Sequence, residues 1–585
     1  MVSSKATTRA AVDILAHRVR GFAAAAVYVL PALAVYGVFV LWPLARLAIL
    51  SLERWDGFTP PVFVGLDNYA GLWNDPGFVQ ELRHSLLWLA VTLTVPVALG
   101  LALALLLRAV APRPRAVLRA LLLIPLLLPT VLIAVAWRLF YNPLSGPLTG
   151  ALQDLHLGGL AQDWLGDPNL ALPALLVIAC WASFGLSMLI CEAALVGISA
   201  EVVAAARVDG AGTLAILWAI TLPALRGVVP LATVATAFCA VPSYDLITLI
   251  TNGGPGYATT TLDLDAYGRA FGGMGQIGMG AALACLQGLA GIVLAVAALL
   301  IACGHERGEP ASSDMPGRRR SRRTALATAV LIAATAAALA PLAWLAVLAL
   351  RPAMGASAWA TLGANLATVW GQGFGGAIAT GLEMGVGVAA ATAVLALPAA
   401  FAIAGSRKRA ARAVAAALLA LGLFQPLAVL IIPLFDLIRR LGLMDTAVGV
   451  IAPEVARVLP VAVLLLWIGV RGLPSGVLEA AAVDGAPPRQ VLLAVALPLL
   501  RPLLVVILAW SFLVSWNDYL LPTVVIQDAG IVTVPTALAQ FIGRFDTEYG
   551  LLATGALLAL LPIVVLYAGL YRLLGRGISR LGGIA

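Results

Sequence analysis

Charged residues are scarce in this chain. They make up 11% of its 585 residues, whereas a soluble domain carries about 25%. Hydrophobic residues make up 62%, and the mean hydropathy is +1.01. A charge deficit of this size over so long a chain excludes a large soluble core and indicates that lipid surrounds most of its length. The chain is therefore predicted to be an integral membrane protein, and its net charge of +8 does not indicate nucleic-acid binding.

Lysine is also nearly missing. Only Lys5 and Lys408 occur, and neither follows a glycine, so the phosphate-binding loop GxxxxGK[ST] is absent. This excludes hydrolysis of nucleoside triphosphates through that loop. The five cysteines lie singly in apolar runs, and the four histidines are scattered, so neither residue type has the spacing of a metal site or a disulfide framework. We expect no catalytic residues, no metal and no cofactor bound by this chain.

Long apolar runs, by contrast, are abundant. Crossing the hydrocarbon core takes about 20 residues in a helix, and the sequence offers twelve such runs. The first is too long for a signal peptide and is expected to be a retained membrane helix. The predicted spans are Phe22–Leu50, Leu86–Leu107, Val117–Tyr141, Leu170–Val196, Leu217–Ile250, Ile277–Cys303, Ala325–Leu350, Ala377–Ala404, Ala413–Ile438, Ile451–Val470, Leu492–Ile526 and Leu551–Leu573. Pro223 and Pro498 are expected to bend or interrupt the two long fifth spans.

The distribution of basic residues indicates the orientation. With the N-terminus inside, most of the 36 Lys and Arg residues fall in cytoplasmic connections, and the outer loops carry much of the acid. This is the pattern of the positive-inside rule. We therefore predict a multi-pass protein with both termini in the cytoplasm. The pair Arg439–Arg440 falls outside and is the weakest point of this topology.

A polar stretch divides the twelve runs into two sets of six. It extends from His305 to Arg323, carries Pro, Ser and Gly, and ends in a basic run, as a flexible cytoplasmic linker does. We predict a first half over residues 1–304, a basic linker over 305–324 and a second half over 325–585. The two halves are parallel repeats within one chain.

Two stretches, one in each half, read almost alike. They are AAARVDGAGTLAILWAITLP (204–223) and EAAAVDGAPPRQVLLAVALP (479–498), which match at ten of twenty positions. In each, an alanine-rich helix is followed by Asp-Gly, where the glycine adopts the left-handed conformation that ends a helix. Thr213 in one copy and Pro487-Pro488 in the other can begin a second helix. Both copies are predicted to be helix–turn–helix elements on the cytoplasmic face, with small residues that another protein can approach closely.

This pattern resembles the cytoplasmic EAA loop of permease subunits of binding-protein-dependent ABC importers. Three further segments resemble carbohydrate-uptake permeases of the maltose/glycerol-phosphate type: VGLDNYAGLWNDPGF (Val64–Phe78), ITNGGPGYATTTL (Ile250–Leu262) and SWNDYLLP (Ser515–Pro522). The two halves resemble two partner permeases that are usually separate chains and look fused here. The resemblance implies an all-α integral membrane fold of twelve transmembrane helices, arranged as two six-helix MetI-like permease halves in a bacterial inner (cytoplasmic) membrane.

The resemblance also implies the partners. Two cytoplasmic ABC ATPase subunits would bind ATP and Mg, an extracellular solute-binding protein or lipoprotein would deliver the solute, and the solute would be a sugar or sugar-like molecule. The family glutamate is Glu479 in the second loop, but the first loop has Ala204 there, and we hypothesise that Glu201, one helical turn earlier, replaces it. Within the loops 201–223 and 476–498, the residues expected to couple to the ATPases are Glu201, Ala205, Ala206, Asp209, Gly210, Ala211, Glu479, Ala480, Ala481, Asp484, Gly485 and Ala486.

Polar and aromatic residues near the outer ends of the fifth spans are candidates for the substrate path. Aromatic faces stack on sugars, and polar groups at membrane depth are costly and often functional. Interfacial anchoring and helix packing are the alternative explanation. The candidates are Tyr244, Asp245, Trp516, Asn517 and Asp518. Three further charged residues could gate the pore, pair with one another or extend to the interface: Arg138, Glu383 and Arg457.

Two other classes of protein compete with the importer. A twelve-span secondary carrier also has six-plus-six spans, but it works without an ATPase and does not need two coupling loops. A membrane enzyme such as a lipid-linked glycosyltransferase needs a cluster of carboxylates or histidines at one membrane face, which the sequence does not show. The chain is therefore predicted to be a transport component and no enzyme.

Overall fold

The computed structural model describes residues 22–196, 198–230, 232–233, 236, 243–273, 275–303, 322–352, 357–405, 427–473, 475–528, 530–544 and 548–581. Within these ranges the only strands are β1 (Glu53–Arg54) and β2 (Val62–Phe63), an antiparallel pair with Glu53 opposite Phe63. All other regular structure there is helical. Seven of the described helices are long and apolar enough to cross a membrane, and a bent pair makes an eighth. The predicted all-α membrane fold is confirmed, while the number twelve stays a prediction.

The chain divides into two compact units, and each contains segments from both predicted halves. Unit 1 comprises Met1–Leu50, Gly373–Ala537 and Ala559–Ala585, and unit 2 comprises Ser51–Gln372 and Leu538–Leu558. The first helices of the first half thus belong with most of the second half. The first helices of the second half belong with most of the first. The predicted boundaries near residues 304 and 325 describe the order of the halves along the sequence and stay a prediction.

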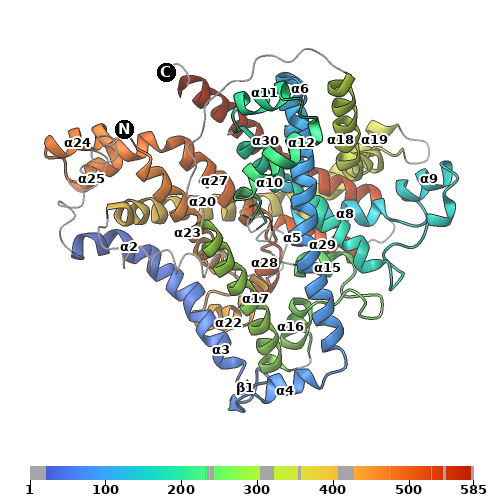
Figure 1. Ribbon diagram of the computed structural model, residues 1–585. Coiled ribbons are helices and arrows are strands. Elements are labelled where there is room, and N and C mark those ends of the chain that lie inside the picture. The colour runs from blue at the N-terminus through green and yellow to red at the C-terminus, as the bar shows by residue number, and fades with distance from the viewer. Residues whose placement is uncertain are drawn as a thin grey trace. The chain divides into compact units, whose positions relative to one another are not determined.

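In unit 1 a long helix, α20 (Gly375–Gly405), packs against α23 (Ala447–Arg471) and α27 (Arg501–Trp516). The N-terminal helix α2 (Phe22–Tyr36) lies along α20 and α23 (Figure 1). The remaining elements that lie wholly in unit 1 are η1 (Gly37–Leu41), α3 (Trp42–Leu50), α22 (Leu427–Arg440), α24 (Ser475–Val483), α25 (Pro488–Gln490), η5 (Val491–Ala496), α26 (Leu497–Leu499) and α28 (Leu520–Val525). Two helices are shared with unit 2: unit 1 contains the start of α29 (Val534–Arg544) and the end of α30 (Tyr549–Leu581).

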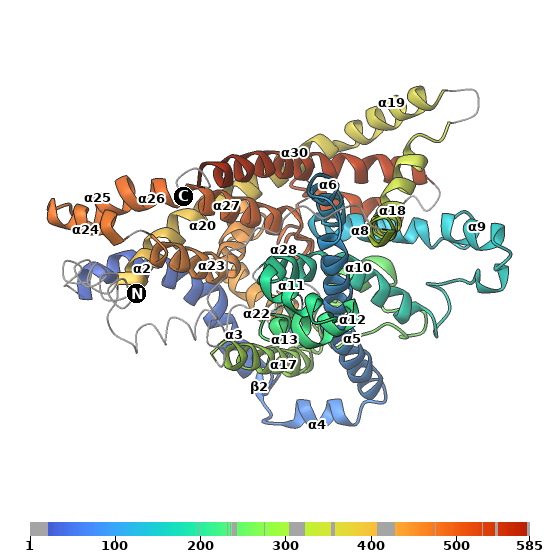
Figure 2. The ribbon, with the colours of Figure 1, turned by 45° about the horizontal axis from the view of Figure 1, so that its top comes forward.

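In unit 2 the helices α5 (Phe78–Arg108) and α10 (Ala171–Val196) run against each other (Figure 2). They approach closely at Gly100, where a Cβ atom would lie 2.6 Å from the backbone nitrogen of Met188. The helix α18 (Arg322–Ala349) packs on α6 (Pro112–Leu122) and α8 (Thr130–Phe140). Further elements are α4 (Asp67–Trp73), α7 (Ile124–Leu127), α9 (Pro147–Asp154), η2 (Gly158–Leu160), α11 (Ala200–Val208), α12 (Thr213–Ile216), η3 (Leu217–Thr221), α13 (Leu222–Leu225), α15 (Tyr244–Ile250), α16 (Leu262–Phe271), α17 (Ile277–Cys303) and α19 (Ala358–Val369), with η4 (Trp370–Phe374) at the boundary of the units.

Prolines break two of the predicted spans. The single helix expected over Val117–Tyr141 is wrong, because α7 and α8 are separated by extended backbone at Leu128 and Pro129. A residue before proline avoids helical backbone angles. In the second half the fifth span bends by 80° between Leu499 and Arg501. The expected bend is present, but it lies before Pro502 instead of at Pro498, because Pro502 has no N–H to continue the helix.

Two further predicted spans are only partly described. The run 217–250 begins as η3 and α13 and ends as α15, and most of residues 231–242 lie outside the described ranges. The run 413–438 is represented by α22, because residues 406–426 also lie outside. The same is true of the linker up to residue 321.

Candidate functional site

The first repeated stretch forms a helical hairpin. Its helix α11 begins after Ser199, whose Oγ accepts a hydrogen bond from the backbone N–H of Glu201 (3.2 Å). After α11, Gly210 has φ +84°, and the N–H of Ala211 donates to the carbonyl of Ala206 (2.8 Å). This hydrogen bond closes the glycine turn that typically ends a helix. The chain then turns into α12.

The second repeated stretch has the same backbone hydrogen bonds. Gly485 has φ +78°, and the N–H of Ala486 donates to the carbonyl of Ala481 (3.1 Å). Pro488 then begins α25, which lies beside α24 in both views of the structure (Figures 1 and 2). The predicted helix–turn–helix is confirmed in both copies, since the same Asp-Gly sequence produces the same local turn.

The two hairpins leave much of their surface open. Exposed side chains include Glu201, Ala204, Ala205 and Asp209 in the first hairpin and Ala480 and Asp484 in the second, and Ala206 and Ala481 are half-buried. For Glu479 the structure describes the backbone, within α24, but not the side chain. An exposed Glu201 is compatible with the hypothesis that it replaces the glutamate missing at Ala204. The coupling roles of these residues stay a prediction.

Tyr244 and Asp245 stand at the start of α15 in unit 2. The ring of Tyr244 is 4% exposed and lies 4.8 Å from the ring of Tyr267, so in this conformation it serves helix packing. Just before it, the hydroxyl of Ser243 donates to the carboxylate of Asp263 (2.7 Å). The loop at the end of α15 is closed by Thr259, whose hydroxyl donates to the carbonyl of Gly254 (2.8 Å). Dense hydrogen bonding thus holds the segment that carries both candidates.

In unit 1 the candidates lie at the end of α27. The ring of Trp516 is 1% exposed and stacks on Phe512 at 5.7 Å and 17°. Both rings face α20, because Cβ atoms added at Gly381 and Gly385 would lie 3.0 and 2.7 Å from Trp516 and Phe512. The two glycines, one helical turn apart, therefore provide the flat surface that the aromatic rings occupy.

Asp518 is held by a buried ion pair. Arg457 Nη2 donates to Asp518 Oδ2 at 2.7 Å, and the Asp518 side chain is 2% exposed. Glu454, one turn before Arg457 on α23, is also buried, and neither of its carboxylate oxygens has a hydrogen-bond partner among the described residues. Sequence reasoning missed Glu454, although an acidic residue three positions before an arginine in an apolar run was a usable signal. Asn517 Oδ1, beside this cluster in the sequence, is likewise buried without a described partner.

The three charged residues left open by the sequence behave differently. Arg457 pairs with Asp518, as described above. Arg138, in unit 2, donates from Nη1 to the carbonyl of Leu249 (3.5 Å) and so ties α8 to α15. Glu383 is exposed on α20. Among the described contacts, none of these three residues forms an ion pair with another of the three, so the prediction that they pair with one another is wrong there.

The arginine pair that fitted the predicted topology least has a local counter-ion. Asp436 is buried on α22 and lies 3.4 Å from Arg439 and 2.8 Å from Arg440. One carboxylate therefore offsets part of the positive charge of the pair. This reduces the conflict between its predicted outer position and the positive-inside rule.

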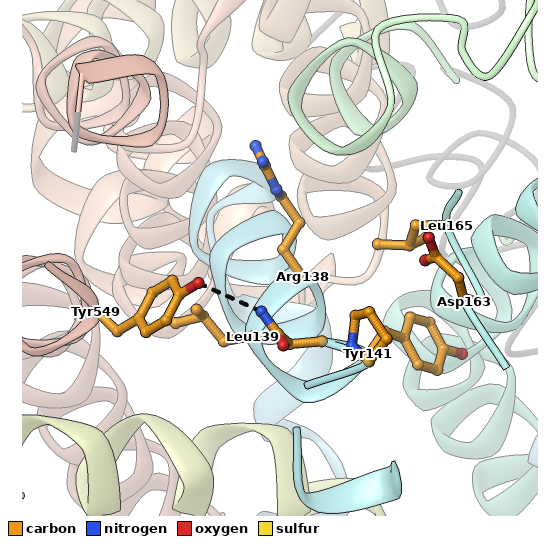
Figure 3. A pocket seen from close by; sticks show the side chains of 8 residues that line it. Arg138, Leu139, Tyr141, Asp163, Leu165 and Tyr549 are labelled. Atoms are coloured by element: carbon orange, nitrogen blue, oxygen red, sulfur yellow. Dashed lines mark hydrogen bonds between the residues drawn. The ribbon is translucent and has the colours of Figure 1, made fainter. Parts of the chain in front are cut away.

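A hollow of about 340 Å³ lies in unit 2 at the end of α8 (Figure 3). Four elements contribute to it: the last turn of α8, the turn after it, the segment before α10 and the first residue of α30. Asn142 Nδ2 donates to the hydroxyl of Tyr549 across 407 positions of sequence (3.4 Å). The lining residues are Arg138, Leu139, Tyr141, Asn142, Pro143, Asp163, Leu165 and Tyr549.

Comparison with known proteins decides the family. The family model described as "binding-protein-dependent transport system inner membrane component" matches residues 95–305 and matches again over residues 396–580. This chain belongs to that family. Each of its two matched segments contains one of the two helical hairpins. The predicted membership and the two permease domains are confirmed, so the chain is a membrane transport component and no enzyme, and nothing found supports a secondary carrier.

Similar permeases are about half as long as this one. The diacetylchitobiose uptake system permease protein NgcF of Streptomyces coelicolor is 29% identical over 304 residues, which are 50% of this chain and 86% of the relative. The trehalose transport system permease protein SugB of Mycobacterium tuberculosis is 33% identical over 197 residues, which are 33% of this chain and 72% of the relative. The probable ABC transporter permease protein YurN of Bacillus subtilis is 30% identical over 246 residues, which are 42% of this chain and 84% of the relative.

Proposed function

We propose that this chain is a fused pair of permease subunits of an ATP-driven ABC importer for a sugar or sugar-like solute. The observation that carries the proposal is the double match to one family, with an equivalent helical hairpin in each matched segment. Relatives that match half of this chain or less cover most of their own length, which supports fusion. Two of them are named for the uptake of diacetylchitobiose and trehalose, which supports a sugar as the solute.

In this proposal the two hairpins face the cytoplasm, where both termini also lie, and each docks one ABC ATPase subunit. ATP and Mg bind to those subunits and not to this chain. An extracellular binding protein delivers the solute to the outer loops. Small and half-buried residues such as Ala206 and Ala481 let a partner helix approach, while the glycine turns hold the hairpins in shape.

Closure of the ATPases would then move the hairpins and rock the permease between outward-open and inward-open states. The candidates for the substrate path lie at the start of α15, which carries Tyr244 and Asp245, and at the end of α27, where Trp516 is followed by Asn517 and Asp518. Several of these side chains are packed or ion-paired in the described conformation. They would contact the solute only in a state in which these contacts open.

The energy source of uptake tests the proposal. Right-side-out vesicles from cells that produce the chain with its ATPase and binding-protein partners are supplied with radiolabelled trehalose or diacetylchitobiose. Depleting ATP while the ion gradients are kept should stop uptake. Uptake that continues on the gradient alone would instead establish the secondary carrier and refute the proposal.

The unequal hairpins allow a matched comparison. If Glu201 replaces the glutamate missing at Ala204, Glu201→Ala should weaken co-purification of the ATPase about as strongly as Glu479→Ala. Adding Ala204→Glu to Glu201→Ala should restore it, because the carboxylate returns to the family position one turn away. Wild-type co-purification and uptake in Glu201→Ala would refute this hypothesis and leave the importer proposal intact.

A further inference from the structure

The hollow at the end of α8 contains none of the coupling residues and none of the five substrate-path candidates. In the predicted topology, the end of α8, the turn at Asn142 and the start of α30 are all on the outer side. The hydrogen bond between Asn142 and Tyr549 joins two of these outer ends within one compact unit. The hollow is therefore placed where a solute arrives from outside.

The hollow is connected to the helix that carries the first substrate-path candidates. Arg138 lines the hollow, and its Nη1 binds the carbonyl of Leu249 near the end of α15. Tyr244 begins α15 five residues earlier, which is about 7.5 Å along a helix. Because α15 runs toward the outer side in the predicted topology, the hollow lies outward of Tyr244.

The lining of the hollow combines aromatic and polar groups. Tyr141 is buried, and its ring stacks on Trp164 at 6.1 Å and 26°. Tyr549 is half-buried, and Asp163 is exposed. Tyr549 and Asp163 approach the end of α8 from opposite sides (Figure 3). A few polar groups on an aromatic and aliphatic wall are typical of small-molecule sites, and the volume is at the lower end of their range of about 300–1,000 Å³.

The charges around the hollow favour a neutral ligand. Asp163 Oδ1 accepts a hydrogen bond from the N–H of Gly166 (3.0 Å), which fixes the carboxylate at the rim. Among the eight lining residues Arg138 is the only cation, and its guanidinium points away from both Asp163 and Tyr549 (Figure 3). An ionised carboxylate accepts hydrogen bonds from sugar hydroxyls and repels acidic groups.

We propose that this hollow is an outer subsite that binds one ring of a neutral, hydroxylated sugar before the sugar moves inward. The Tyr549 ring contacts the apolar face of the sugar, and Asp163 and Asn142 bind its hydroxyls. A uronic acid is disfavoured by Asp163. This inference rests on the proposed function, which it extends by naming the place and the charge class of the first sugar contact.

Cysteine protection tests the subsite in right-side-out vesicles that contain the complete transporter. Leu165 lines the hollow, and Leu155 is an exposed leucine of the same connection that does not. Labelling of Leu165→Cys by a membrane-impermeant maleimide, corrected for the parent chain, should slow several-fold with glucose, N-acetylglucosamine or trehalose. Labelling of Leu155→Cys should not change. Glucuronic acid should protect Leu165→Cys much less.

Two further variants separate binding from folding. Asp163→Asn keeps an acceptor for the Gly166 N–H and removes the charge, so protection by neutral sugars should weaken and the discrimination against glucuronic acid should disappear. Tyr549→Phe keeps the ring and should preserve protection, whereas Tyr549→Ala should abolish it. Co-purification of the ATPase subunits shows that each variant is assembled.

Three results would overturn the subsite: failure of Leu165→Cys to react from outside, protection by none of the neutral sugars, or equal protection by glucuronic acid. Unchanged protection in Asp163→Asn and Tyr549→Ala would show that Asp163 and Tyr549 do not bind the sugar. If ATP-dependent uptake persists in these cases, only the subsite is wrong. Uptake without ATP refutes the proposed function itself.

Discussion

The ion pair between Arg457 and Asp518 offers the sharpest test of how the second half is held together. The two side chains meet at 2.7 Å, with Asp518 2% and Arg457 27% exposed. Arg457→Met removes the cation and keeps much of the side-chain volume. Breaking a buried pair by removing one partner costs about 3–5 kcal/mol, because the other charge stays buried without its counter-ion. Glu454, buried one turn away, is a second carboxylate that would no longer have the Arg457 cation nearby.

The expected result is a clear fall in the thermal unfolding temperature of the purified chain in lipid nanodiscs. Asp518→Asn, which leaves Arg457 partly exposed, should lower it less. The double variant Arg457→Met/Asp518→Asn should be more stable than the Arg457→Met variant, since both charges have gone. The matched control is Arg501→Met, which removes an exposed arginine from the start of α27.

Two outcomes would refute this reasoning. One is an Arg457→Met variant that unfolds at the same temperature as Arg501→Met. The other is a double variant that is less stable than either single variant, which would mean that the two changes act on separate parts of the structure. Uptake, measured alongside, separates a loss of stability from a loss of transport in a variant that remains folded.

Three more predictions concern the hairpins, the outer face and helix packing. Gly485→Val places a branched side chain at φ +78° and should cost about 1–2 kcal/mol in the turn; ATPase co-purification should fall, and wild-type recovery would contradict the coupling role. Arg269 donates a hydrogen bond to Asp75 (2.6 Å), which lowers the pKa of the Asp75 carboxyl. The pair therefore stabilises the fold above the ordinary carboxyl pKa, and this contribution is lost as the pH falls through the lowered pKa. Asp75→Asn should make the stability of the protein depend less on pH in the acid range, and an unchanged pH dependence would exclude this role. Gly100→Val should lower the unfolding temperature, because its Cβ would lie 2.6 Å from the nitrogen of Met188 on α10; an unchanged temperature would mean that α5 and α10 can move apart freely.

Much of the local structure was predictable because it depends on short stretches. Apolar runs predicted the long helices α5, α10, α20 and α23, since lipid requires each spanning segment to satisfy its own backbone. The Asp-Gly turns were predicted because only glycine adopts the left-handed conformation easily. The proline breaks were harder. Several prolines lie inside helices, and the sequence does not say which ones interrupt them, as Pro502 does in preference to Pro498.

The candidate sites were predicted less completely. The sequence indicated Asp518 and Arg457 separately, but not that they bind each other, and it missed Glu454. For Tyr244 and Trp516 the sequence left substrate contact, interfacial anchoring and helix packing open. Both are packed on other rings, which depends on the partners Tyr267 and Phe512 and on the glycines of α20. The hollow at Tyr549 gave no signal at all, because its parts are far apart in the sequence.

The sequence by itself determined that this is a membrane protein, where most of its long helices run and where its two helical hairpins turn. Each of these properties depends on the residues of one segment and on whether lipid or water surrounds that segment. Only the tertiary structure decided that α2 packs with the second half, that α18 packs with the first, and that Asn142 meets Tyr549. Helices that are apolar on every side carry no hydrophobic pattern to mark the face that meets a neighbour, so close packing at small residues and a few polar contacts decide it.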